Sequence, residues 1–186
     1  ITDWICCNPF WVKDAWEPYT IAKRLDNWSQ VVPPLGSKGM LSHEFIQELM
    51  RSVTMQAQFL MENLEYDVDN NHLIADAKAL AVAGTVFASL PFSSRWREKG
   101  YSLLWAEMEK QVHSEGSHCE HSISYHMVVL KDYLEAVLIA KKYGVGVPAN
   151  VREKLEAMFS YLASMILPTD ETFLINDSVR GYPMNP

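Results

Sequence analysis

The 186-residue chain has no apolar run of the roughly 18–20 residues that a membrane-spanning helix needs. Its first residues, ITDWICCNPF, lack both an initiating methionine and the basic stretch and apolar core of a secretion signal, so we take the chain as a mature or trimmed form. The chain also lacks positive charge: its formal net charge is −7, which disfavours nucleic acid and anionic membranes as partners. An anionic substrate would therefore need a local cationic site.

Cysteine is scarce as well. The three cysteines, Cys6, Cys7 and Cys119, are an odd number and contain no C-x-x-C pair. This pattern provides neither a disulfide framework nor a zinc-finger motif. We expect three unpaired thiols.

Helical periodicity is present nearly throughout, with no convincing strand, and an apolar content of 48% suffices for the core of one domain. The predicted helices run from Pro18 to the Pro33-Pro34 pair, from Ser42 to Leu64, from Leu73 to Phe87, from Ser94 to Val112, from His121 or Ser122 to Gly144, and from Asn150, as N-cap, to just before Pro168. Six helices joined by short polar loops predict an all-α fold of antiparallel helical hairpins.

The run HSEGSHCEHSISYH at residues 113–126 is too polar for a core and dense in proton-transfer groups. Glu115-Gly116-Ser117 is predicted to be a turn, and HSISYH to begin a helix. That helix would place His121 and Tyr125 on one face, and Ser122 and His126 on another. Simpler readings remain open: Glu120 and Ser122 as helix caps, and Tyr125 as a buried tyrosine with a satisfied hydroxyl.

The same run carries residue types that bind zinc, namely His113, His118, Cys119, His121 and His126. Their spacing matches no familiar set such as H-E-x-x-H. A metal hydrolase is thus an alternative hypothesis, and we expect neither a metal nor another cofactor.

Two further features have both a structural and a functional interpretation. At Asn71 and His72, asparagine caps a helix and histidine is solvated, or the two side chains donate to an anion at the positive end of the helix. Most of the tryptophans are expected in the core, but Trp16 is a candidate for stacking on a sugar ring.

Four segments in order resemble the heparinase II/III family of polysaccharide lyases. They are WEPYTIAKRLDNW (residues 16–28), NHLIADAKALAVAGTVF (71–87), WREKGYSLLWAEMEKQVHSEGSHCEHSISYH (96–126) and DETFLIND (170–177). The resemblance covers most of the chain. Two departures are Glu115, where the family usually has Asp, and Asp76, where Glu is common.

The resemblance implies an (α/α) toroid of helical hairpins followed by β-sandwich modules, in a bacterial enzyme that is periplasmic or secreted. Residues 1–186 would then be a single domain, the N-terminal portion of the toroid lyase domain, without the downstream β-sandwich part. The family's further catalytic histidine would lie beyond residue 186. The implied substrate is an acidic, uronate-containing polysaccharide, either heparan sulfate or heparin-like or alginate-like.

Lyases of this class cleave by β-elimination, removing the C5 proton of a uronate and expelling the C4 oxygen. The resemblance assigns carboxylate neutralisation to Asn71 and His72 and proton transfer to Tyr125. The expected orienting or substrate-binding residues are Glu120, His126, His121, Ser122 and Trp16. The alternative is a catalytically silent glycan-binding or scaffold domain.

Overall fold

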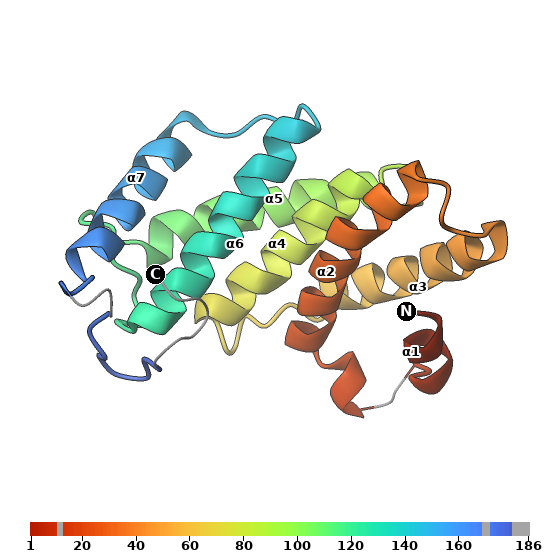
Figure 1. Ribbon diagram of the computed structural model, residues 1–186, viewed down its shortest axis with the longest axis horizontal. Helices are drawn as coiled ribbons and strands as arrows, with labels where there is room; N and C mark the ends of the chain where they lie inside the picture. Colours follow the sequence, from red (N-terminus) through yellow and green to blue (C-terminus); the bar gives the residue numbers. More distant parts are fainter. Residues whose placement is uncertain (11–12, 169–171, 180–186) are drawn as a thin grey trace. The chain divides into compact units, whose positions relative to one another are not determined.

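The computed structural model describes residues 1–10, 13–168 and 172–179. These ranges contain the helices α1 (Thr2–Cys7), η1 (Lys13–Trp16), α2 (Pro18–Ser37), α3 (His43–Glu62), α4 (Asn70–Val86), α5 (Ser93–Gln111), α6 (Ile123–Lys142) and α7 (Ala149–Ser164) (Figure 1). Strand-like pairing among the described residues is confined to two isolated bridges, Val112–His118 and Ile166–Thr172. The all-α prediction is confirmed, although α1 and the 3₁₀ helix η1 were not expected.

The chain divides into two compact units. The first consists of residues 1–67 and 75–101, and the second of residues 68–74 and 102–186. Helices α4 and α5 contribute residues to both units. None of the described helices is both long and apolar enough to cross a lipid bilayer.

In the first unit, α2 and α3 pack as a hairpin (Figure 1). Four residues on one face of α3 are fully buried, namely Leu49, Val53, Ala57 and Leu60, whereas the apolar residues Ile46, Met50, Met61 and Leu64 are partly buried. The four buried residues join Ile21, Leu25 and Trp28 of α2 in one core. Residues spaced three or four apart share one face of a helix, which is why the sequence pattern alone located this core.

The prediction that Pro33 and Pro34 end the first long helix is wrong, since α2 continues to Ser37. Proline lacks the N–H donor, but its fixed φ near −65° is compatible with a helix, so the chain continues for about one more turn after the pair. Gly39 lies just beyond the C-cap residue Lys38, and its φ of 67° suits glycine. There the amides of Gly39 and Met40 donate to the carbonyls of Gly36 and Leu35, a Schellman motif.

Close packing of α4 and α5 in the first unit depends on two glycines. A Cβ atom on Gly100 would lie 2.2 Å from the backbone nitrogen of Ala81, and one on Gly84 would lie 2.4 Å from the carbonyl oxygen of Ser93. Only glycine permits such backbone contact. The small residues of ADAKALAVAG therefore allow close helix packing.

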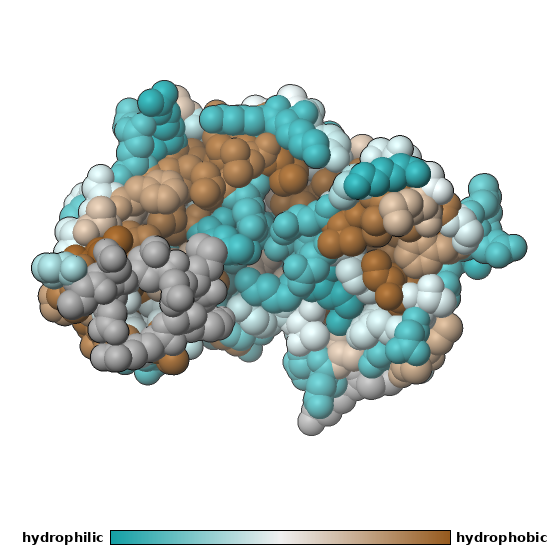
Figure 2. Space-filling model, in the orientation of Figure 1, coloured by the Kyte–Doolittle hydropathy of each residue, from teal (hydrophilic) through white to brown (hydrophobic). Residues whose placement is uncertain are grey.

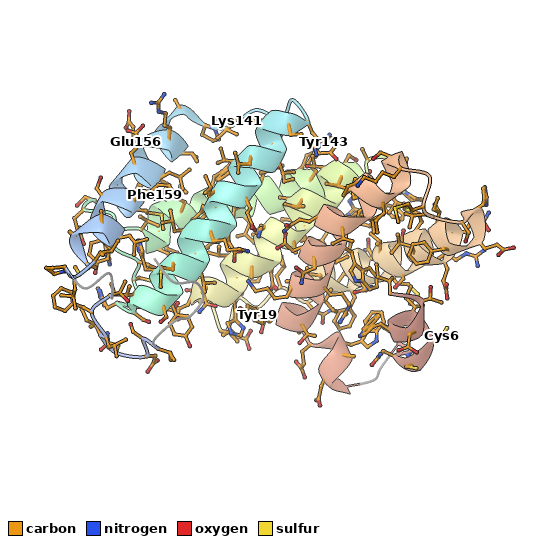
Figure 3. All side chains as sticks on the ribbon, viewed as in Figure 1. Cys6, Tyr19, Lys141, Tyr143, Glu156 and Phe159 are labelled. Atoms are coloured by element: carbon orange, nitrogen blue, oxygen red, sulfur yellow. The ribbon has the colours of Figure 1, made fainter. Side chains whose placement is uncertain are left out.

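In the second unit, α6 and α7 form another hairpin (Figure 1). Its buried residues include Val129, Tyr133, Val137, Leu155 and Met158. Figure 2 shows apolar surface over α6 and α7. Leu138 of α6 and Phe159 of α7 are exposed apolar side chains. Figure 3 labels Phe159 on α7 and Tyr143 at the C-terminal end of α6.

Helix α7 begins two residues earlier than predicted, and its N-cap is Pro148 rather than Asn150. The side-chain amide of Asn150 donates to Glu109 at 2.7 Å and caps nothing. Proline fixes φ near the value that a helix start requires, so the chain enters the helix before Asn150 is reached.

Candidate functional site

The start of α4 is held in an unusual backbone conformation within the second unit. Asp69 and Asn70 both have positive φ values, 61° and 50°, which cost energy in residues other than glycine. The last turn of α5 holds them in place. Lys110 Nζ lies 2.7 Å from Asp69 Oδ2, and Gln111 Nε2 donates to the Asn70 carbonyl oxygen at 3.2 Å. These contacts fix the chain immediately before Asn71.

Asn71 contacts Glu120, 49 residues further along the chain. The Asn71 Nδ2 atom lies 2.9 Å from Glu120 Oε2 and 3.1 Å from Oε1, and the Asn71 side chain is buried. The two amide N–H bonds diverge by about 120°, whereas the two oxygens of one carboxylate are close together, so a single N–H serves both. The second N–H is left for another acceptor. The NNH motif and the polar run therefore meet, while the role of Asn71 stays a prediction.

The polar run begins with a tight turn at Glu115–Gly116–Ser117, as predicted. The His113 amide donates to the Ser117 carbonyl at 2.9 Å, and the Gly116 amide donates to the His113 carbonyl at 3.0 Å. Gly116 has φ of 94°, and a Cβ atom there would lie 2.2 Å from the Ala157 carbonyl oxygen of α7. Glycine is thus required twice at this position, for its conformation and for its contact with α7.

His118 is a central residue of the site, although sequence reasoning considered it only as a metal ligand. Its ring is 1% exposed, and its Nε2 atom lies 3.0 Å from Gln111 Oε1. Its Nδ1 atom lies 3.5 Å from Glu120 Oε2. Burial lowers the pKa of His118 to about 4, and the nearby His126, His113 and His121 contribute in the same direction. The ring is therefore neutral at physiological pH.

Tyr125 lies in the first turn of α6, and Ser122 is the N-cap of that helix. The Ser122 hydroxyl accepts from the Tyr125 amide at 3.4 Å and lies 3.2 Å from the Ser178 hydroxyl. Ser122 thus follows the capping interpretation. The Tyr125 side chain is partly exposed, and nothing in residues 1–10, 13–168 and 172–179 pairs with its hydroxyl. The interpretation as a buried, satisfied tyrosine is wrong, and proton transfer by Tyr125 stays a prediction.

The segment after α7 anchors this helix start. Ser178 Oγ accepts from the Ile123 amide at 2.8 Å, and Asn176 Nδ2 donates to the His121 carbonyl oxygen at 2.8 Å. Sequence reasoning found the segment only as part of a family resemblance. Of its DETFLIND motif, residues 170 and 171 lie outside the described ranges.

The predicted helical face shared by His121 and Tyr125 is wrong. Helix α6 starts at Ile123, because the Ser122 side chain caps it, and His121 precedes the helix with φ of 51°. The His121 ring is instead exposed and stacked on His113, with ring centroids 5.7 Å apart and an interplanar angle of 12°.

The orienting role of His126 stays a prediction, and the contacts that the structure shows for this residue are with α7. Its buried ring lies with Nε2 3.1 Å from the Met158 carbonyl oxygen and packs against Tyr161, so it joins α6 to α7. Burial lowers the pKa of His126, and the bond to Met158 acts in the opposite direction. The ring thus has a structural role in this hairpin.

Trp16, in the first unit, is 5% exposed. Its indole Nε1 donates to the Asn8 carbonyl oxygen at 3.3 Å, and Phe10 and Phe59 pack against it edge to face. The prediction that Trp16 stacks on a sugar ring is wrong for this structure, because its faces are covered by the core. Trp16 also lines a hollow of about 220 Å³.

His72 is half-buried in the first turn of α4, and its role stays a prediction. Trp11 lies outside the described ranges.

The metal hypothesis loses its geometric basis. Within the part of the chain that the structure describes, no three His, Cys or carboxylate ligand atoms of the polar run converge within 4.8 Å. The Nε2 atoms of His118 and His126 already lie within bonding distance of Gln111 and Met158. Cys6, Cys7 and Cys119 are free thiols.

An all-α chain of helical hairpins, with a polar site built at two helix starts, is the class of protein that these observations define. Residues 1–183 match the family model described as Heparinase II/III N-terminus. The chain therefore belongs to the heparinase II/III family, as its N-terminal region.

Relatives of known activity and structure agree. The chain is 28% identical over 184 residues to a heparin-sulfate lyase of Pedobacter heparinus, covering 95% of the chain and 28% of the relative. It is 26% identical over 172 residues to a heparin-sulfate lyase of Bacteroides thetaiotaomicron, covering 91% of the chain and 24% of the relative. The chain thus spans about a quarter of the length of these relatives.

A crystal structure of heparinase III matches 96% of the chain and 29% of its own length, with a TM-score of 0.82 and 25% identity. The heparan sulfate lyase HepC of Pedobacter heparinus matches 95% of the chain and 29% of its own length, with a TM-score of 0.71 and 29% identity. These matches confirm the predicted fold class, the helical hairpins of an (α/α) toroid.

Proposed function

We propose that this chain supplies the helical part of a polysaccharide lyase that cleaves heparan sulfate, or a closely related uronate polymer, by β-elimination. Family membership and the lyase activity named for its relatives support the class of reaction. The observation that carries the proposal is the contact of Asn71 with Glu120, because it joins the two polar motifs into one site and leaves one amide N–H for a ligand. A periplasmic or secreted location is part of the same proposal.

The reaction requires charge neutralisation first. Removing the C5 proton of a uronate places negative charge on the adjacent carboxylate, which is already anionic. A donor aimed at that carboxylate stabilises the transition state more than the ground state. The second N–H of Asn71 and the imidazole of His72 are the groups that we assign to this role.

The elimination itself moves one proton and one electron pair. The C5 proton leaves to a base, the C5–H electrons form the C4=C5 double bond, and the C4–O bond breaks. The expelled oxygen takes up a proton. Tyrosine hydroxyls are ordinarily protonated at neutral pH, so Tyr125 can deliver that proton as a general acid. Its side chain is partly exposed, and its hydroxyl has no partner among the residues that the structure describes, which suits this role.

The test is an assay of the polypeptide in its natural length against heparan sulfate, heparin and alginate. We expect ultraviolet absorbance of the C4=C5 product to rise with heparan sulfate and much less with alginate. Asn71→Ala is expected to slow the rise, since it removes the carboxylate donor. No product from any of these polymers, with retention on immobilised heparan sulfate, would establish the silent glycan-binding alternative instead.

A further inference from the structure

Gln111 is the residue on which the contacts of the site converge. It is 2% exposed at the end of α5, and its Nε2 atom donates to Glu107 Oε2 at 2.7 Å and to the Asn70 carbonyl oxygen at 3.2 Å. Both partners are acceptors, so the NH₂ group must face them. The Gln111 Oε1 atom therefore faces His118, and its orientation is fixed by chemistry as well as by packing.

The orientation of Gln111 determines the tautomer of His118. An amide oxygen only accepts, so His118 Nε2 must carry the hydrogen in the 3.0 Å bond to Gln111. Nδ1 is then bare, and it faces Glu120 Oε2 at 3.5 Å. Two acceptors at this distance do not bond, so the Glu120 carboxylate is left to accept from Asn71.

The backbone holds His118 in this place. The Cys119 amide donates to the Gln111 carbonyl at 2.9 Å, and Val112 forms a bridge with His118. Hydrogen bonds thus run from the start of α4 to Gln111 and on to His118, the chain leads from His118 to Glu120, and Glu120 accepts from Asn71. We call these residues the Asn71 ring: Asn70, Asn71, Gln111, His118 and Glu120.

We propose that Gln111 and His118 are positioning residues, which through the Asn71 ring set the direction of the free N–H of Asn71. The inference rests on the lyase function proposed above, but the orientation of Asn71 is measurable without turnover. Neither residue needs to touch substrate. Gln111 acts from one side by holding the strained backbone at Asn70, and His118 from the other by holding the segment that carries Glu120.

The test compares two replacements of His118 in the natural-length protein. His118→Gln keeps an N–H near the Nε2 position, whereas His118→Phe removes it. We expect His118→Phe to lower kcat by about ten- to a hundred-fold with KM within about twofold, because a misdirected donor is felt mainly in the transition state. His118→Gln should stay within about threefold of the wild-type kcat. Equal losses in both variants would overturn the proposal.

A second readout does not depend on activity. In ¹⁵N NMR spectra of the 186-residue chain, the Asn71 side-chain amide is identified by its disappearance in Asn71→Ala. We expect its signals to shift in His118→Phe and to stay in place in His118→Gln. Unmoved signals in His118→Phe would overturn the positioning role. If wild-type protein cleaves no polymer, the proposed function fails, and this comparison alone decides the inference.

A third variant approaches the ring from Gln111. Gln111→Glu keeps an acceptor for His118 but loses the donors to Asn70 and Glu107. We expect it to shift the same Asn71 signals and to lower kcat to a similar extent. It takes the place of His118→Phe should that protein not fold, and unmoved Asn71 signals would again overturn the proposal.

Discussion

The side-chain nitrogen of Asn71 lies 2.9 and 3.1 Å from the two carboxylate oxygens of Glu120. A neutral amide is what makes this contact favourable, because a carboxylate in its place would meet Glu120 as a like charge in a largely buried setting. Substitutions at Asn71 and Glu120 therefore test whether one of the two side chains must be an uncharged amide.

Asn71→Asp should lower the free energy of unfolding by about 1–3 kcal/mol, since it replaces a donor with a second acid beside Glu120. Adding Glu120→Gln should restore stability, because an amide again faces a carboxylate. Turnover should stay low in both proteins, since the donor to the uronate is lost. Chemical denaturation at pH 7 measures the first effect, and a double variant no more stable than Asn71→Asp would contradict it.

Tyr125→Phe should reduce turnover by about 10²–10⁴-fold, the usual contribution of a general acid or base. Its free energy of unfolding should change by less than about 0.5 kcal/mol, because the hydroxyl has no partner in the described part of the chain. Product absorbance and thermal melting provide the two measurements. Turnover within a few-fold of wild type would remove Tyr125 from the mechanism.

Gly116→Ala and Gly144→Ala form a matched pair. Both glycines have positive φ, 94° and 71°, but a Cβ atom meets the Ala157 backbone at Gly116 and nothing within 4 Å at Gly144. Gly144→Ala should cost about 1 kcal/mol for the left-handed conformation alone. Gly116→Ala should lower the free energy of unfolding clearly more than Gly144→Ala does. It should also reduce turnover, because the turn that precedes His118 must shift. Equal losses of stability in the two variants would contradict this prediction, because they would show that α7 moves aside for the added Cβ atom at little cost in free energy.

His118 should make the second unit less stable in acid. Its pKa is about 4 in the folded chain against an ordinary 6.5, so the unfolded chain binds the extra proton between these values. Stability should therefore fall as pH drops from 6.5 to 4, by at most about 3 kcal/mol. The ionisable groups facing the ring are Glu120, Cys119, His113, His121 and His126. His118→Gln should flatten this dependence in denaturation curves, and an unchanged slope would contradict the assignment.

Asp76, in the first unit, should act with the opposite sign. Burial raises its pKa to about 8 from 3.8, so the folded chain keeps a proton that the unfolded chain has released. Stability should decline as pH rises from 4 to 8. Asp76→Asn keeps an oxygen for the Glu65 amide, which donates to Asp76 at 3.0 Å, and removes the titration. The variant should gain stability relative to wild type at pH 8, and no gain there would count against a protonated Asp76.

The sequence alone predicted the fold well and the site in part, for reasons visible at particular residues. Periodicity located the buried stripe of α3, since burial there follows helical spacing. Sequence patterns failed to locate helix ends that depend on local geometry. Pro33 was predicted to end α2 but lies within it, and Asn150 was predicted to cap α7 but donates to Glu109. The contact of Asn71 with Glu120 joins distant segments, and the family resemblance supplied both residues but not their pairing.

His118 and Gln111 show what spacing cannot reveal. Each residue type has many uses, and only the tertiary structure shows that one amide faces Glu107, Asn70 and His118 together. The contacts of His126 with α7 were not visible in the sequence either. Its position next to Tyr125 in the sequence suggested a shared task, but consecutive helix residues point in different directions, and its ring reaches α7.

Helix α7 carries none of the candidate site residues, yet one stretch of its backbone serves as a fixed point for two of the segments that do. The Ala157 carbonyl abuts Gly116, and the Met158 carbonyl accepts from His126. A substitution on the outer face of α7 that tilts the helix would carry the turn before His118 and the first half of α6 along with it. Differences in activity between members of this family can therefore originate in a helix that a comparison of site residues would pass over.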